Sequence, residues 1–144
     1  MMEGDLFAAT ETGRSEEVVK EKAAPVPGGT LVLARVQDTR PKHLDGGRTV
    51  LRPSLPYDEA TRIASCFLDL YIGARYAPSP SVSGCVCRAT VLSGTVSLTA
   101  EGQSFQLLER DAIRFRADQP YHFENYSNST GRLLLEYQYL REHA

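Results

Sequence analysis

The residues of this sequence with the most evident chemistry are three cysteines, Cys66, Cys85 and Cys87. Cys85 and Cys87 lie two positions apart, so on a β-strand both would face the same side of a sheet. Thiolates at this spacing can bind zinc or copper, with a tyrosine or histidine completing a tetrahedral set. Two other interpretations are open, because buried cysteines often pack as small apolar side chains and low-pKa thiolates serve redox chemistry. The odd number of cysteines, without an export signal, favours reduced thiols over a disulfide framework.

Arg88 is the second candidate for chemistry, and on a strand it would face away from Cys87. Its guanidinium could anchor a carboxylate or a phosphate through two parallel hydrogen bonds, or it could lie exposed on an outer strand face. Arg114 and Arg116 alternate with apolar residues and are expected to face solvent. The sequence contains no Gly-rich phosphate loop, Ser-His-Asp order or HExxH pattern.

The elements that must position these residues are short strands. The stretch over residues 91–125 shows the strand pattern most clearly. Apolar residues recur there at every second position, as at Val96 and Leu98, which predicts half-buried strands. Turn residues such as Glu101 and Gly102 separate the strands. Further strands are predicted over residues 30–36, 48–55, 63–72, 85–92 and 132–140. Short strands joined by tight turns predict an all-β fold, a single antiparallel β-barrel or jelly roll.

Two regions are expected along the chain. Residues 1–28 are predicted to be an N-terminal tail, in which residues 15–22 could form a short helix before Pro25 and Pro27 end it. Residues 29–144 are predicted to form one β-barrel domain. A chain of 144 residues with 42% hydrophobic residues has the length and composition for one substantial core.

Residues 91–125 also carry a family resemblance. They contain VLSG at residues 91–94, D-x-x-x-F-x-A-D-x-P at residues 111–120 and an aromatic-polar run that ends at Asn125. This pattern resembles the core of a cupin, and it is most similar to the C-terminal sensor cupins of helix-turn-helix transcription regulators. The resemblance extends over residues 29–140 and implies a cupin barrel that binds a small molecule. The predicted tail is too short for the DNA-binding head of such a regulator, so we expect no direct nucleic-acid binding by this chain.

The resemblance also implies that the usual metal ligands of a cupin are replaced. Where the family has a glutamate, seven positions before the glycine of VLSG, this sequence has Cys87. Where the second motif of the family has a histidine, this sequence has Tyr121, and His122 is displaced by one position, which on a strand turns it to the other face. No cofactor is therefore expected. The residues that could still hold a divalent metal are Cys85, Cys87 and His122, the last only if a bulge turned it inward.

The interior of the barrel is the expected binding pocket. The side chains predicted to contact a ligand are Cys66, Leu70, Cys87, Ile113, Phe115, Tyr121 and Tyr137. Tyr121 could either hydrogen-bond a ligand or fill the cavity. The predicted function is binding of a small molecule without catalysis, and the alternative is a metal-dependent cupin enzyme, of dioxygenase or isomerase type, with a rebuilt thiolate site.

Charge and hydropathy indicate the location of the chain and the partners that it can bind. A formal net charge of −2 argues against nucleic-acid binding through positive charge spread over the whole chain. The sequence has no apolar run long enough to span a membrane and no signal peptide at its start, so a cytoplasmic location is expected. Phe67 and Tyr71 are predicted to lie on an outer strand face, where they could form the contact of a homodimer.

Overall fold

The computed structural model describes residues 31–140 of a chain that divides into two units, Met1–Arg35 and Val36–Ala144. In the first unit the described residues 31–35 form neither helix nor strand. The strand predicted over residues 30–36 is therefore wrong for the part that the structure describes. In the second unit the sheet edge beside β2 (Thr49–Pro53) is occupied by β1 (Lys42–Leu44), a segment without strand periodicity in its sequence. The predicted tail over residues 1–28 lies outside the described residues.

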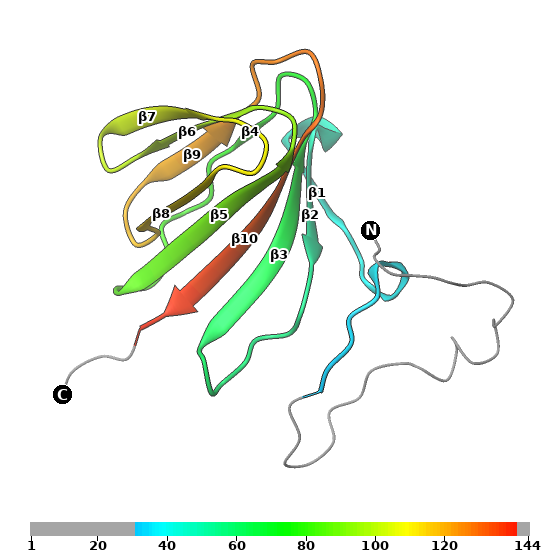
Figure 1. Cartoon of the computed structure of the whole chain (residues 1–144), viewed down its shortest axis with the longest axis vertical. Coiled ribbons are helices and arrows are strands. Elements are labelled where there is room, and N and C mark those ends of the chain that lie inside the picture. Colours follow the sequence, from blue (N-terminus) through cyan, green and yellow to red (C-terminus); the bar gives the residue numbers. More distant parts are fainter. Residues whose placement is uncertain (1–30, 141–144) are drawn as a thin grey trace, which may run out of the picture. The chain divides into compact units, whose positions relative to one another are not determined.

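Residues 36–140 form two antiparallel sheets (Figure 1). The larger sheet has the strand order β1-β2-β3-β10-β5-β8, and the smaller has the order β4-β9-β6-β7. The remaining bounds are η1 (Val36–Asp38), η2 (Asp45–Gly47), β3 (Ile63–Leu70), β4 (Arg75–Tyr76), β5 (Cys85–Ser93), β6 (Val96–Ala100), β7 (Gln103–Leu107), β8 (Ala112–Arg116), β9 (Tyr121–Glu124) and β10 (Gly131–Tyr139). Within residues 31–140, no helix has the length and apolar character needed to cross a membrane.

The predicted all-β antiparallel fold is confirmed, but the two sheets do not close into a barrel. Each sheet keeps two edge strands, β1 and β8 in the larger and β4 and β7 in the smaller. The chain passes from one sheet to the other through the segments that follow β3, β4, β5, β7, β8 and β9, and no strand of one sheet pairs with a strand of the other. The result is a two-layer arrangement of the jelly-roll kind with a core between the layers.

The core is built from the strand faces that the two-residue period predicted. On β5 the buried Cys87, Ala89 and Val91 alternate with exposed Arg88 and half-buried Thr90. Both sheets contribute to one apolar cluster, which includes Leu68, Leu70, Val91, Val96, Leu98, Phe123, Leu133 and Leu135. Phe105 is 40% exposed although its pattern matches the other strands, because it lies on the edge strand β7.

The loop between β9 and β10 is held by one buried amide. Nδ2 of Asn125 donates hydrogen bonds to the carbonyl oxygens of Leu70, at 2.8 Å, and Ser129, at 2.7 Å. Oδ1 of Asn125 accepts from the backbone N–H of Ser127 at 2.8 Å. The side chain therefore ties the end of β3 to the turn that leads into β10, and it satisfies backbone groups that burial would otherwise leave unpaired.

Candidate functional site

A group of phenol and thiol side chains gathers at one end of the two sheets, where β5 and β9 begin and β10 ends. Its members are Cys66 on β3, Tyr76 on β4, Cys87 on β5, Tyr121 on β9 and Tyr137 on β10, and we call it the Tyr–Cys cluster. Cys87 and Tyr121 are buried, while Cys66, Tyr76 and Tyr137 are half-buried. Cys66, Tyr76 and Tyr137 are therefore partly exposed to solvent at this end of the sheets.

Strand register explains why these residues meet. Cys87 lies directly opposite Tyr137 on one side and opposite Phe115 on the other. All three side chains therefore occupy one row on the inner face of the larger sheet. Tyr76 lies opposite Phe123 on the β4–β9 pair of the smaller sheet. The cluster thus draws one residue from each of five strands, three of them in residues 63–93 and two in residues 121–139.

The hydroxyl of Tyr137 is the centre of the cluster. It lies 2.7 Å from the hydroxyl of Tyr121, close enough for a hydrogen bond in which either can be the donor. The side chains of Tyr76 and Cys87 lie close enough to Tyr137 to interact with it electrostatically. Several hydroxyl and thiol groups therefore converge at one point, and each of these groups can either donate or accept a hydrogen bond.

Burial keeps these groups in their neutral forms. Desolvation raises the pKa of the Cys66 thiol to about 11 and the pKa of Tyr76 to about 12. Burial also raises the pKa of Cys87, Tyr121 and Tyr137 well above their ordinary values. At neutral pH the cluster is uncharged, because phenols and thiols carry charge only above their pKa.

Aromatic rings pack against one another beside the cluster. The ring of Phe115 lies 4.9 Å from the ring of Tyr121 and 6.1 Å from that of Phe123, centroid to centroid. Tyr121 and Phe123 meet edge to face at 6.1 Å. Edge-to-face and tilted contacts of this kind stabilise a rigid apolar surface. The hydroxyl and thiol groups of the cluster and these aromatic rings therefore lie side by side at this end of the two sheets.

The structure brings together most of the side chains that the sequence placed in the pocket. Cys66, Cys87, Tyr121 and Tyr137 belong to the cluster, and Phe115 lies beside it. Leu70 lies at the opposite end of β3, where it is fully buried next to Asn125. Ile113 lies on the edge strand β8 opposite Ala89, whereas Phe115 lies opposite Cys87. Ile113 is therefore farther from the Tyr–Cys cluster than Phe115.

Tyr76 is a member that the sequence did not predict. It belongs to β4, a strand of only two residues between Gly73 and the Pro-rich loop that follows. Two residues are too few to show a two-residue period. The only signal in the sequence was an aromatic residue inside a loop of otherwise small and polar residues.

The three residues named as metal candidates do not converge. Cys85 and Cys87 both face the interior, and both are fully buried. His122 lies on the other face of β9 from Tyr121, half-buried, with Nε2 3.4 Å from Oε1 of Glu124. The pairing of β9 with β6 is regular from Tyr121 onward, so no bulge turns His122 inward.

The donors present at the cluster do not fit the metal that a cupin holds. Among residues 31–140, no three His, Cys, Asp or Glu side chains lie close enough together to hold a metal ion. The available groups are phenols and two thiols whose neutral forms burial favours.

The fold is shared with solved cupin structures. A cupin_2 domain of an XRE family transcriptional regulator from Enterobacter cloacae is similar with a TM-score of 0.63 and 24% identity, over 65% of this chain and 99% of that one. A predicted oxalate decarboxylase from Thermotoga maritima is similar with a TM-score of 0.64 and 14% identity, over 76% of this chain and 100% of that one. The polyketide cyclase RemF from Streptomyces resistomycificus is similar with a TM-score of 0.60 and 18% identity, over 79% of this chain and 83% of that one.

This chain therefore has the cupin fold, as the motifs in residues 91–125 predicted. No protein-family model matches the sequence, and no match is found among the curated proteins. The similar structures include a regulator domain and proteins described as enzymes, so the fold alone does not decide between binding and catalysis. That question depends on the residues of the site.

Proposed function

We propose that this chain is a sensor-type cupin domain that binds an uncharged small molecule at the Tyr–Cys cluster and performs no chemistry on it. The observation that carries the proposal is the hydrogen bond between the hydroxyls of Tyr121 and Tyr137 at the partly exposed end of the apolar core. A pair of neutral hydroxyl groups in an apolar site fixes the orientation of a ligand through hydrogen bonds. The likeness to the cupin domain of a transcriptional regulator is consistent with a sensing role.

The absence of charge at the site favours binding over catalysis. Among residues 31–140, the buried polar side chains are Thr49 and Asn125, and none is Asp, Glu, Lys, Arg or His. General acid–base catalysis needs a group whose pKa lies near the working pH. The phenols and thiols of the cluster have pKa values raised by burial, which takes them away from that range.

The same features define the chemistry of the ligand. A carboxylate or an ammonium group would lose its hydration without gaining a charged partner among the buried side chains, which is unfavourable. A carbonyl, ether or hydroxyl oxygen would accept a hydrogen bond from Tyr137 or Tyr121 at little cost. The remainder of the ligand should be apolar or aromatic, because it would contact Phe115 and Phe123.

A thermal-shift screen of small metabolites tests this proposal. Uncharged compounds with a hydroxyl or carbonyl group should raise the unfolding temperature, since a ligand that binds only the folded state stabilises it. Tyr137→Phe removes the central hydroxyl and should weaken the binding of any such hit by about tenfold, the equivalent of one good hydrogen bond. The matched control is Tyr71→Phe, which removes the hydroxyl of an exposed tyrosine outside the cluster and should leave binding unchanged.

Two results would count against the proposal. One is a set of hits confined to anionic compounds, which the neutral cluster does not favour. The other is an affinity that falls equally in Tyr137→Phe and Tyr71→Phe, because binding would then not depend on the cluster.

A further inference from the structure

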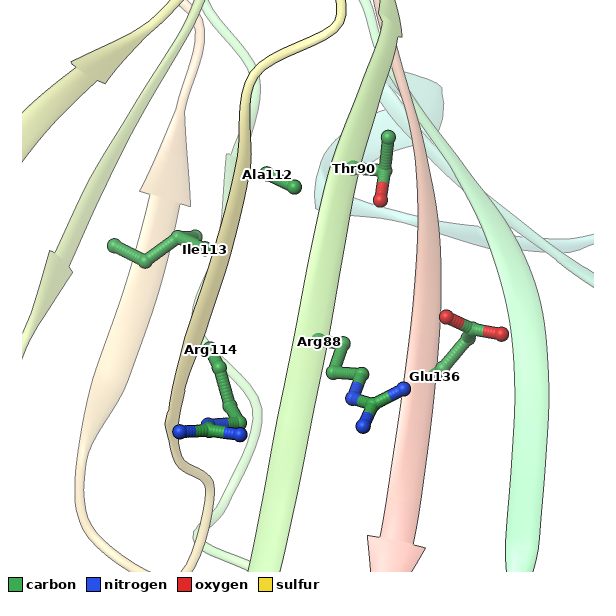
Figure 2. Close-up of a pocket in the computed structure, with 6 residues that line it drawn as sticks. All are labelled: Arg88, Thr90, Ala112, Ile113, Arg114 and Glu136. Atoms are coloured by element: carbon green, nitrogen blue, oxygen red, sulfur yellow. The ribbon is translucent and has the colours of Figure 1, made fainter.

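The outer face of the larger sheet carries a shallow hollow of about 420 Å³, on the side away from the Tyr–Cys cluster. Strands β5, β8 and β10 form it, and it is lined by Arg88, Thr90, Ala112, Ile113, Arg114 and Glu136 (Figure 2). Cys87 and Arg88 are consecutive on β5, so their side chains leave opposite faces of the sheet. The hollow is therefore separate from the proposed ligand site.

Two arginines lie side by side on neighbouring strands of this face. Arg88 on β5 lies directly opposite Arg114 on β8, and both are exposed. At neutral pH both guanidinium groups are charged. Like charges directly opposite each other on neighbouring strands destabilise a sheet. The pair therefore weakens the sheet unless something negative lies between its members.

Neither arginine forms an ion pair with a side chain in the described part of the chain. Glu136 lies opposite Arg88 on the other side, yet no ion pair joins them within 4.0 Å. Neither arginine side chain forms a hydrogen bond with a residue in the range 31–140. Arg132, on the same outer face, does form an ion pair, with Asp69 at 3.6 Å. Arg88 and Arg114 thus keep their donors free where another arginine of the same face has a partner.

We propose that Arg88 and Arg114 form a binding site for the oxyanion group of a small molecule, a phosphate or a carboxylate. The planar guanidinium matches both groups with two parallel hydrogen bonds. Thr90 faces the same hollow and provides a hydroxyl donor, and the small side chain of Ala112 leaves room beside it. Figure 2 shows Arg88 and Arg114 on neighbouring strands, with Glu136 on the far side of Arg88. That carboxylate opposes the binding of an anion and limits its affinity.

The experiment titrates the protein with inorganic phosphate and, separately, with succinate at low ionic strength, followed by amide chemical shifts. Arg88→Gln and Arg114→Gln should each weaken binding by about tenfold, the loss expected for one charge-assisted bidentate contact. Glu136→Gln should strengthen binding, by about threefold, because it removes a repelling charge. Arg132→Gln is the matched control on the same face and should change nothing. Comparing the two titrations distinguishes a phosphate site from a carboxylate site.

Stability measurements on the same variants make the test decisive. Both arginines are exposed and unpaired within residues 31–140, so Arg88→Gln and Arg114→Gln should leave the unfolding temperature unchanged or raise it. An unfolding temperature that falls, with anion binding unaffected, would assign the pair a structural role and overturn the proposal. Equal weakening by Arg132→Gln would also overturn it, because the binding would then reflect only the positive charge of the face.

Discussion

Gly94→Ala is expected to lower the free energy of unfolding by about 4 kcal/mol or more, a large part of the roughly 5–15 kcal/mol that stabilises a typical domain. Gly94 has a φ of +82°, a left-handed conformation that side chains disfavour. A Cβ at this position would lie 2.4 Å from the carbonyl oxygen of Thr130 and 2.9 Å from Cα of Gly131. Both atoms belong to the backbone and cannot move aside as a flexible side chain would. Chemical denaturation of the two proteins measures the difference.

Gly102→Ala is the matched control for this prediction. Gly102 has a similar φ of +75°, but a Cβ there would meet nothing within 4 Å. Its substitution should cost only the conformational strain, about 1 kcal/mol. Equal losses at Gly94 and Gly102 would mean that the close approach of the loops after β5 and β9 does not limit stability.

The second large effect concerns Cys66, whose alkylation at pH 8 should be about 100-fold slower in the folded protein than in the unfolded chain. The thiolate is the reactive form. Burial raises the pKa of Cys66 from 9.0 to about 11, and each unit lowers the thiolate fraction tenfold below that pKa. The rate in the folded protein should therefore keep rising with pH up to about 11, whereas an ordinary thiol levels off above 9. Iodoacetamide labelling followed by mass spectrometry measures both rates.

Cys66→Ser identifies the reacting thiol, because Cys85 and Cys87 are fully buried. This variant should abolish labelling of the folded protein on the same time scale. A rate that already levels off at pH 8 would contradict the prediction. It would indicate a stabilised thiolate, which is the state that the alternative, metal-dependent enzyme requires.

The sequence predicted well those strands that have one face in the core. Buried residues recur at every second position from Cys85 to Val91 on β5 and from Gly131 to Leu135 on β10. The same reasoning failed at residues 30–36, because alternation gives no information on whether a partner strand is available. Closure into a barrel could not be predicted from the sequence either. It depends on whether an edge strand of one sheet forms backbone hydrogen bonds with an edge strand of the other.

The candidate sites depended on pairings that the sequence does not contain. Tyr121 and Tyr137 were both predicted to line the interior, but their mutual hydrogen bond follows from how the two sheets pack. Arg88 was singled out as a possible anchor for an anion, whereas Arg114 was expected simply to face solvent. Their direct opposition arises from the register of β5 with β8, two strands about 25 residues apart in the chain.

Measuring the alkylation rate of Cys66 with and without an uncharged ligand from the screen tests whether the Tyr–Cys cluster binds that ligand. Cys66 belongs to the partly exposed Tyr–Cys cluster, so a ligand bound there should cover its thiol. Labelling should slow in proportion to the bound fraction and return to its original rate when the ligand is removed. An unchanged rate at saturating ligand would place the ligand elsewhere and contradict the claim that the Tyr–Cys cluster is the binding site.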